Sequence, residues 1–168
     1  FPEPFSRGTE TFYRRWTRVY SRQMVREEIR DLTQVRQVGQ MEMLARLLPD
    51  KVGNLFSINS IREDLKVSFE TIKNWIGIFQ NFFLAFLIPP WSKKLARAIH
   101  KEPKLYLYNW ALVSDAGSRF ENMVALHLYQ AVTFWNERGL GEFGLYFVRD
   151  RQKNEVDFLI SNGKDPFL

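Results

Sequence analysis

The stretch from Ser57 to Gln80 constrains the fold most, because two helical patterns follow each other almost without a break. Ile61 and Leu65 form the apolar side of the first pattern, and Ser68 predicts the N-cap of the second. The second helix is expected to bury residues at three- and four-residue spacing, namely Ile72, Trp75, Ile76 and Phe79. Two helices joined only by Lys66–Val67 predict a helix-turn-helix.

A strand-like segment and a basic segment follow the second helix. "LAFLIPPW" reads as an extended segment closed by prolines, and "SKKLARAIHKEPK" supplies a basic loop. This order favours the winged form of a helix-turn-helix, at about residues 54–90. Ser60 with Glu63 resembles a capping box at the start of the first helix, although Ser57 or Asn59 could equally be the cap.

Basic residues gather in the middle of the chain. Residues 51–110 contain nine basic and four acidic residues, a net charge of +5, whereas residues 111–168 have a net charge of −2. A local excess of Lys and Arg is typical of a region that meets a polyanion, here double-stranded DNA, although the charge could also serve solubility alone. The candidate nucleic-acid contacts are Lys73, Asn74, Lys93, Lys94, Arg97, Lys101 and Lys104.

The DNA reading has an alternative at the same place. The second helix would enter the major groove, and nearby Lys and Arg would hold phosphates. However, Glu70 lies on the same exposed face as Lys73 and opposes the approach of a phosphate. Winged helices also pack against proteins, so both readings stay open.

The N-terminal part is expected to be helical. Residues 10–36 predict one long helix, with an apolar stripe that begins Phe12, Trp16, Tyr20, Met24. Another row at four-residue spacing is Arg14, Arg18, Arg22, Arg26. This row is either a solvated face or a contact with phosphate or with an acidic neighbouring subunit. A second helix is expected at about 40–48, ending at Pro49.

The C-terminal part combines a helix with strands. Residues 104–112 alternate like a strand, and a helix from Gly117 to Gly139 has an apolar stripe of Phe120, Val124, Leu128, Ala131, Trp135. Residues 145–149 and 155–161 predict a β-hairpin. We therefore expect an α+β chain, with a helical winged-helix-like half over residues 1–103 and a second half over residues 104–168.

Several classes of protein are excluded by composition. The chain has no cysteine and two histidines in no ligand spacing, which argues against disulfides and zinc. Its longest apolar run, Phe82–Ile88, is too short to cross a membrane. Nothing resembles a secretion signal, so we expect a cytoplasmic protein without a membrane partner.

Two carboxylates raise the question of a metal site. Glu121 lies early in the long helix and Asp157 on the last strand, and Mg²⁺ is often held by one or two carboxylates together with a substrate phosphate. The alternatives are surface charges or ion pairs of the hairpin. Glu155 shares a strand face with Asp157 and is expected to pair with Arg149 or Arg151.

A family resemblance extends along nearly the whole chain. Its motifs are "FPEPF", "KEPKLYLYNWAL", "GSRFENMVALHL" and "YFVRDRQKNEVDFLI". They resemble the C-terminal region of a prokaryotic family of AAA-type ATPases, in which a winged-helix region precedes a domain of unknown function similar to PD-(D/E)xK nucleases. The resemblance implies that Glu121 and Asp157 are catalytic metal ligands, that Mg²⁺ binds the complete domain, and that the protein self-associates through its ATPase.

The chain also departs from that family pattern. The nuclease superfamily adds a strand with E-x-K, whereas this chain stops at Leu168, so we expect a truncated and inactive nuclease-like half. Asn109 stands where the family commonly has Asp. No Gly-rich phosphate loop is present, so ATP would bind only in a missing N-terminal domain. An enzyme-derived region, a binding module and an oligomerisation segment remain the three readings.

Overall fold

The structure is a computed structural model that describes residues 6–23, 37–92, 101–150 and 152–167. Its helices are α2 (Glu10–Gln23), α4 (Val38–Leu47), α5 (Ile58–Leu65), α6 (Phe69–Asn81) and α8 (Ala116–Glu137), with short 3-10 helices η2 (Leu48–Lys51) and η3 (Trp110–Leu112). The strands are β1 (Ala85–Ile88), β2 (Lys104–Leu107), β3 (Phe143–Arg149), β4 (Glu155–Asn162) and β5 (Asp165–Pro166). Helices with small antiparallel sheets confirm the α+β class.

The helix pair α5–α6 forms as the sequence predicts. Lys66 ends α5 in the left-handed conformation, with φ of 54°, which turns the chain sharply into the next helix. The Ser68 hydroxyl then accepts a hydrogen bond of 3.1 Å from the Thr71 amide and caps α6. All four apolar residues predicted for α6 are buried. Of the three candidate caps of α5, Ser57 is confirmed as the N-cap position, although its side chain makes no capping hydrogen bond, and Ser60 lies inside the helix, which begins at Ile58.

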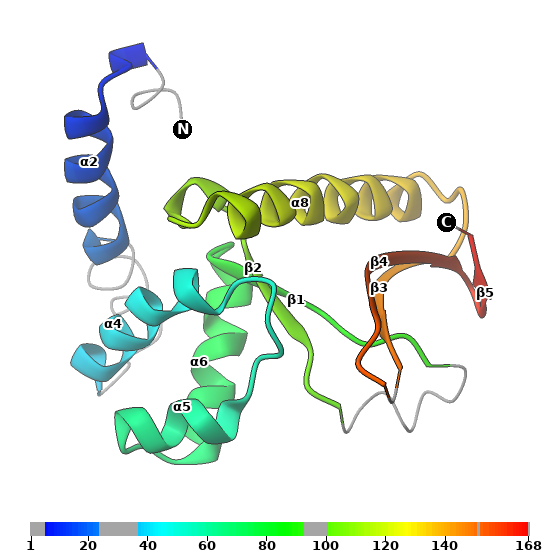
Figure 1. The fold of residues 1–168 in the computed structure, drawn as a ribbon, viewed down its shortest axis with the longest axis horizontal. Helices are drawn as coiled ribbons and strands as arrows, with labels where there is room; N and C mark the ends of the chain where they lie inside the picture. Colours follow the sequence, from blue (N-terminus) through cyan, green and yellow to red (C-terminus); the bar gives the residue numbers. More distant parts are fainter. Residues whose placement is uncertain (1–5, 24–36, 93–100, 151, 168) are drawn as a thin grey trace.

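A β-hairpin completes a winged arrangement around these helices. β1 pairs with β2 in antiparallel register, from Ala85 opposite Leu107 to Ile88 opposite Lys104. The segment before α5 lies along the other edge of β2, where Val52 bridges Leu105 and Leu55 bridges Lys104. The order α4, edge segment, α5, α6, β1, β2 is that of a winged helix-turn-helix (Figure 1).

The two sequence halves share one core. β2 opens the second half by sequence but belongs to the sheet of the first, so the boundary expected at 103/104 falls inside the winged unit. The chain after β1 then runs parallel to β3, where the Trp91 amide donates a 2.7 Å hydrogen bond to the Phe147 carbonyl. Buried apolar residues are continuous from Met41 to Ile160.

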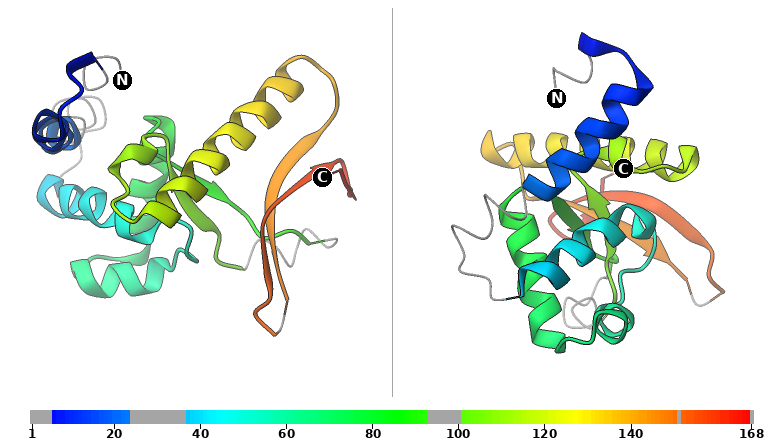
Figure 2. Two further views of the ribbon diagram at one scale, coloured as in Figure 1. Left: turned by 45° about the horizontal axis from the view of Figure 1, so that its top comes forward. Right: turned by 90° about the vertical axis from the view of Figure 1, so that its left-hand side faces the viewer.

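Helix α8 lies across the β1–β2 hairpin and runs toward the β3–β4 hairpin (Figures 1 and 2). Its buried side chains are Asn122, Ala125, Leu126 and Val132. The predicted stripe is therefore wrong at Phe120, which is 64 % exposed. The two sheets beneath α8 determine which of its faces is buried. That face includes the polar Asn122, which apolar periodicity does not reveal.

Two further elements differ in length from the sequence prediction. The strand expected over residues 104–112 ends at Leu107, and η3 follows at Trp110–Leu112. The helix expected over residues 10–36 is α2, Glu10–Gln23, while residues 24–36 lie outside the described part of the chain. The hairpin is confirmed, with β3 and β4 slightly longer than predicted and a bulge between Tyr146 and Val148.

Candidate functional site

The structure brings three carboxylates around one buried lysine. Lys104 is 2 % exposed, and its Nζ lies 2.5 Å from Glu155 Oε1 and 2.8 Å from Asp157 Oδ1. Glu121 Oε1 is 3.6 Å from the same nitrogen. We call Lys104, Glu121, Glu155 and Asp157 the lysine–carboxylate cluster. It brings together the two acids predicted as metal ligands, Glu121 and Asp157, and Glu155, which was expected to form an ion pair.

Three elements position the cluster. Lys104 is the first residue of β2 and is held between Ile88 of β1 and the bridge to Leu55. Glu155 and Asp157 stand two residues apart on β4, so their side chains leave the same face of the strand. The expected ion pair of Glu155 with Arg149 is present at 3.6 Å, but the shorter contact is to Lys104.

Glu121 reaches the cluster from the second turn of α8. The Tyr106 hydroxyl donates a 2.7 Å hydrogen bond to Glu121 Oε1. Gly53 lies against the same carboxylate, because a Cβ added to it would lie 2.9 Å from Glu121 Oε2. Gly53 also has φ of +74°, which favours glycine on its own account. The Glu121 carboxylate is thus fitted between α8, β2 and the edge segment.

The pKa of Lys104 is set by opposing effects. Burial lowers it, whereas the hydrogen bonds to Asp157 and Glu155 and the charge of Glu121 raise it, and the net pKa lies above 10.5. Burial also raises the pKa of Tyr106, and its hydrogen bond to Glu121 adds to this effect. Lys104 is therefore a charged ammonium, and Tyr106 a neutral donor, across the neutral pH range.

This charge state predicts a loss of stability at alkaline pH. A lysine whose pKa is higher in the folded state stabilises fully below its unfolded pKa, near 10.5, and this contribution is lost as pH rises through the folded pKa. Tyr106 acts in the same direction, because the unfolded chain releases its proton first. Urea unfolding between about pH 10 and pH 12 should show a smaller loss in Lys104→Met and Tyr106→Phe than in the wild type. An equal loss in all three proteins would contradict this assignment.

The cluster does not fit Mg²⁺ as it stands. Carboxylate oxygens are suitable ligands, but Mg²⁺ requires oxygens at about 2.0–2.1 Å in an octahedral arrangement. Here the carboxylates converge on an ammonium that is itself a cation, which hydrogen-bonds to Asp157 and Glu155 and forms a longer ion pair with Glu121. Within the described ranges, no group of three or more Asp, Glu, His or Cys residues is arranged to hold a metal ion.

The nucleic-acid candidates divide into three groups. Lys73 and Asn74 are exposed on α6, next to Glu70, and line a shallow hollow along that helix. Lys101 is exposed just before β2, whereas Lys104 faces carboxylates instead of solvent. Residues 93–100, with Lys93, Lys94 and Arg97, lie outside the described part of the chain.

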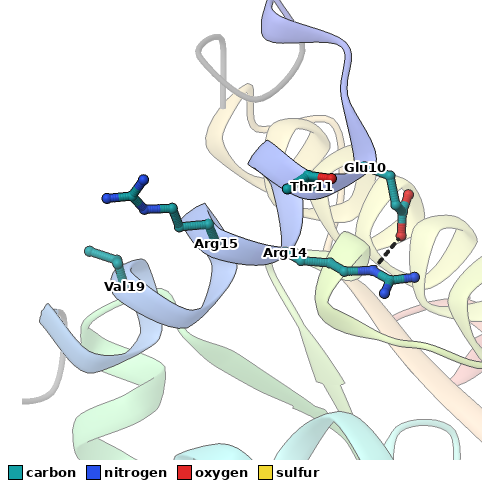
Figure 3. Close-up of a pocket in the computed structure, with 5 residues that line it drawn as sticks. All are labelled: Glu10, Thr11, Arg14, Arg15 and Val19. Atoms are coloured by element: carbon teal, nitrogen blue, oxygen red, sulfur yellow. Dashed lines mark hydrogen bonds and ion pairs between the residues drawn. The ribbon is translucent and has the colours of Figure 1, made fainter.

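Of the predicted arginine row, the structure describes the side chain of Arg14, on helix α2. Figure 3 shows Arg14 reaching back to Glu10, and the ion pair measures 3.0 Å between two largely exposed side chains. Arg15 extends away from that pair beside Val19, along a shallow hollow. An exposed pair of this kind contributes at most about 1 kcal/mol. Tyr13 fastens α2 to the body by donating a hydrogen bond to the Ala111 carbonyl.

The sequence does not reveal the partners of two residues, Lys104 and Asn122. Lys104 was read as a phosphate contact, and Asn122 was not singled out at all. The available signal was that Lys104 and Tyr106 share a face of a short strand otherwise rich in apolar residues. Asn109 precedes η3, and its buried Nδ2 has no hydrogen-bond partner. An Asp at position 109 would place a charged carboxylate where Asn109 has an unpaired buried atom, and it would need a hydrogen-bond or ion-pair partner there.

Among the described helices, none combines the length and the apolar character that crossing a bilayer requires.

Comparison with known proteins places the chain in a family without assigning an activity. An uncharacterized protein of Methanocaldococcus jannaschii is 30 % identical over 137 residues, which are 75 % of this chain and 29 % of that protein. No solved structure matches. A family described as "Domain of unknown function (DUF8612)" matches residues 1–122, which include Lys104 and Glu121 but not the β3–β4 hairpin. The chain therefore belongs to the DUF8612 family.

Proposed function

We propose that this chain is the nucleic-acid-associated C-terminal region of an AAA-type ATPase, in which the winged unit contacts double-stranded DNA. The observation that carries the proposal is the winged order of elements with Lys73 and Asn74 exposed on α6. In such units the second helix enters the major groove while nearby basic residues hold phosphates. The net charge of +5 over residues 51–110 supports the same partner.

The link to an ATPase rests on family resemblance and on length. The chain spans 29 % of the Methanocaldococcus jannaschii relative, so in that protein the matched region is joined to a much longer polypeptide. ATP binding, self-association and a cytoplasmic location would belong to such a whole protein. The nuclease-like half is proposed as a non-catalytic partner of the winged unit. Binding of Mg²⁺ in a complete domain would first require the Lys104 ammonium to leave its carboxylates.

DNA binding can be tested by fluorescence anisotropy with a labelled duplex at several salt concentrations. The logarithm of the association constant is expected to fall linearly with the logarithm of salt concentration, because bound phosphates release counterions. Lys73→Ala should weaken binding about equally for unrelated duplex sequences and should lower the salt slope by about 1. Asn74→Ala should instead affect some sequences more than others, since amides read base edges.

A matched control variant tests whether DNA binding depends on the lysine of α6 or on positive charge anywhere on the surface. Lys164 is an exposed lysine in the turn before β5, within the acidic part of the chain. Lys164→Ala should leave both affinity and salt slope unchanged, whereas neutralising Lys93, Lys94 and Arg97 together should weaken binding further. Duplex binding that is absent or independent of salt would refute the proposal and favour a protein-packing role for the winged unit.

A further inference from the structure

Lys104 is a buried cation that lies apart from the exposed lysine on α6. The Lys104 ammonium faces three carboxylates instead of solvent, and the residue is 2 % exposed. A lysine is rarely buried unless it is paired, and here the ammonium is paired closely with Glu155 and Asp157 and at longer range with Glu121.

We propose that the Lys104 ammonium is the resident cation of the acidic site, in the place where a metal held by Glu121 and Asp157 would have to bind. Three negative charges meet two positive ones, Lys104 and Arg149, which leaves the site with a net charge of −1. A divalent ion added beside the ammonium would be repelled at close range, and an ion in place of it would leave a buried ammonium unpaired.

The backbone around Lys104 keeps this cation in place. The Lys104 backbone pairs with Ile88 of β1 on one side and forms a bridge to Leu55 on the other. A shift of β2 would therefore break both contacts. The Nζ also lies 5.6 Å from the centre of the Phe147 ring, which adds a favourable cation–π contact. Unlike a dissolved ion, this ammonium cannot be removed by a chelator.

The cluster also joins segments that are distant in the sequence. Lys104 belongs to the winged unit, Glu121 to α8, and Asp157 to the hairpin, 53 residues away from Lys104. A cation tethered to β2 therefore attaches α8 and β4 to the winged unit without any ligand. We infer that the acidic site has a structural role in this chain, independent of whether the exposed face of α6 binds DNA.

Titration with Mn²⁺ tests this assignment, since Mn²⁺ accepts the same oxygen ligands as Mg²⁺ and is visible by electron paramagnetic resonance. Wild-type protein should leave the free Mn²⁺ signal undiminished and should unfold at the same temperature with Mn²⁺ or with EDTA. Lys104→Ala removes the ammonium and leaves three carboxylates with one neighbouring cation, Arg149, which pairs with Glu155. This variant should bind Mn²⁺, and the ion should raise its unfolding temperature.

Three comparisons make the result decisive. Lys164→Ala should behave like the wild type, because it removes an exposed lysine instead of the buried one. Asp157→Asn in the Lys104→Ala background should reduce the acquired Mn²⁺ binding. Lys104→Arg retains a cation and should remain indifferent to Mn²⁺.

Two outcomes would overturn the proposal. One is Mn²⁺ binding by the wild type that Asp157→Asn abolishes, because a metal would then occupy the site despite Lys104. The other is a folded Lys104→Ala that gains no Mn²⁺ affinity. If Lys104→Ala does not fold, the wild-type titration and Lys104→Arg still decide the question. None of these readouts depends on DNA, so failure here is distinguishable from failure of the proposed function.

Discussion

Replacing Lys104 with methionine is expected to lower the free energy of unfolding by about 3–5 kcal/mol, because the carboxylates lose their shared cation while they remain partly buried. Methionine keeps most of the side-chain length, so the effect reports the lost charge more than a cavity. Asp157 is 53 % exposed and can be solvated by water, which places the expected value toward the lower end. Urea denaturation at neutral pH measures the change.

A control and a compensating variant test the cause of that loss. Lys164→Met makes the same substitution at an exposed site and should change the free energy of unfolding by less than about 0.5 kcal/mol. Adding Glu121→Gln and Asp157→Asn to Lys104→Met should restore part of the stability, because neutral amides no longer repel one another. A triple variant that is less stable than Lys104→Met would show that the loss is not electrostatic.

Replacing Asn122 with leucine is expected to cost about 2–5 kcal/mol, since the buried amide and carbonyl of Leu107 would both lose their hydrogen bonds to the Asn122 side chain. Asn122 is fully buried on α8. Its Oδ1 accepts a 2.9 Å hydrogen bond from the Leu107 amide, and its Nδ2 donates a 2.7 Å bond to the Leu107 carbonyl. The side-chain amide thus pairs with β2 as a neighbouring strand would.

The same helix supplies a matched control for this prediction. Asn136 makes the equivalent pair of hydrogen bonds with the Phe143 amide and carbonyl, at 2.7 and 2.8 Å, but it is exposed. Asn136→Leu should therefore cost only about 0.5–1.5 kcal/mol, because water can replace the lost bonds. Equal losses for the two variants, measured by urea denaturation, would contradict the role of burial.

These two asparagines explain how α8 holds both sheets. Asn122 contacts β2 and Asn136 contacts β3. Fourteen residues separate them, close to four helical turns, so both side chains leave the helix on nearly the same face. That spacing fixes the position of α8 along the sheets and brings Glu121, next to Asn122, toward the Lys104 ammonium.

The most predictable part of this protein is the winged unit. The α5–α6 pair follows from local signals, namely the Ser68 cap, the sharp turn at Lys66 and an apolar face in α6. The β3–β4 hairpin likewise depends on neighbouring residues. Capping, turns and side-chain periodicity involve residues only a few positions apart, so a single sequence contains the information needed.

The candidate site could be predicted only in part. The sequence predicts Glu121 and Asp157 as metal ligands, which stays a prediction. It also pairs Glu155 with Arg149 or Arg151, and the structure confirms the pair with Arg149. It did not identify Lys104 as their common partner, because strand alternation says which face a side chain occupies and not what lies opposite. The exposed position of Phe120 was missed for a similar reason, since the sheets beneath α8 select the buried face of the helix.

The sequence by itself determined the α+β class, the helix-turn-helix and the hairpin, because each depends on residues close together in the chain. Only the tertiary structure decided the environment of Lys104 and the role of Asn122. Their partners lie 15 to 53 residues away in sequence, at Leu107, Glu121 and Asp157. Such contacts form when separate elements pack against one another, and packing decides whether a charged side chain meets water, phosphate or a carboxylate.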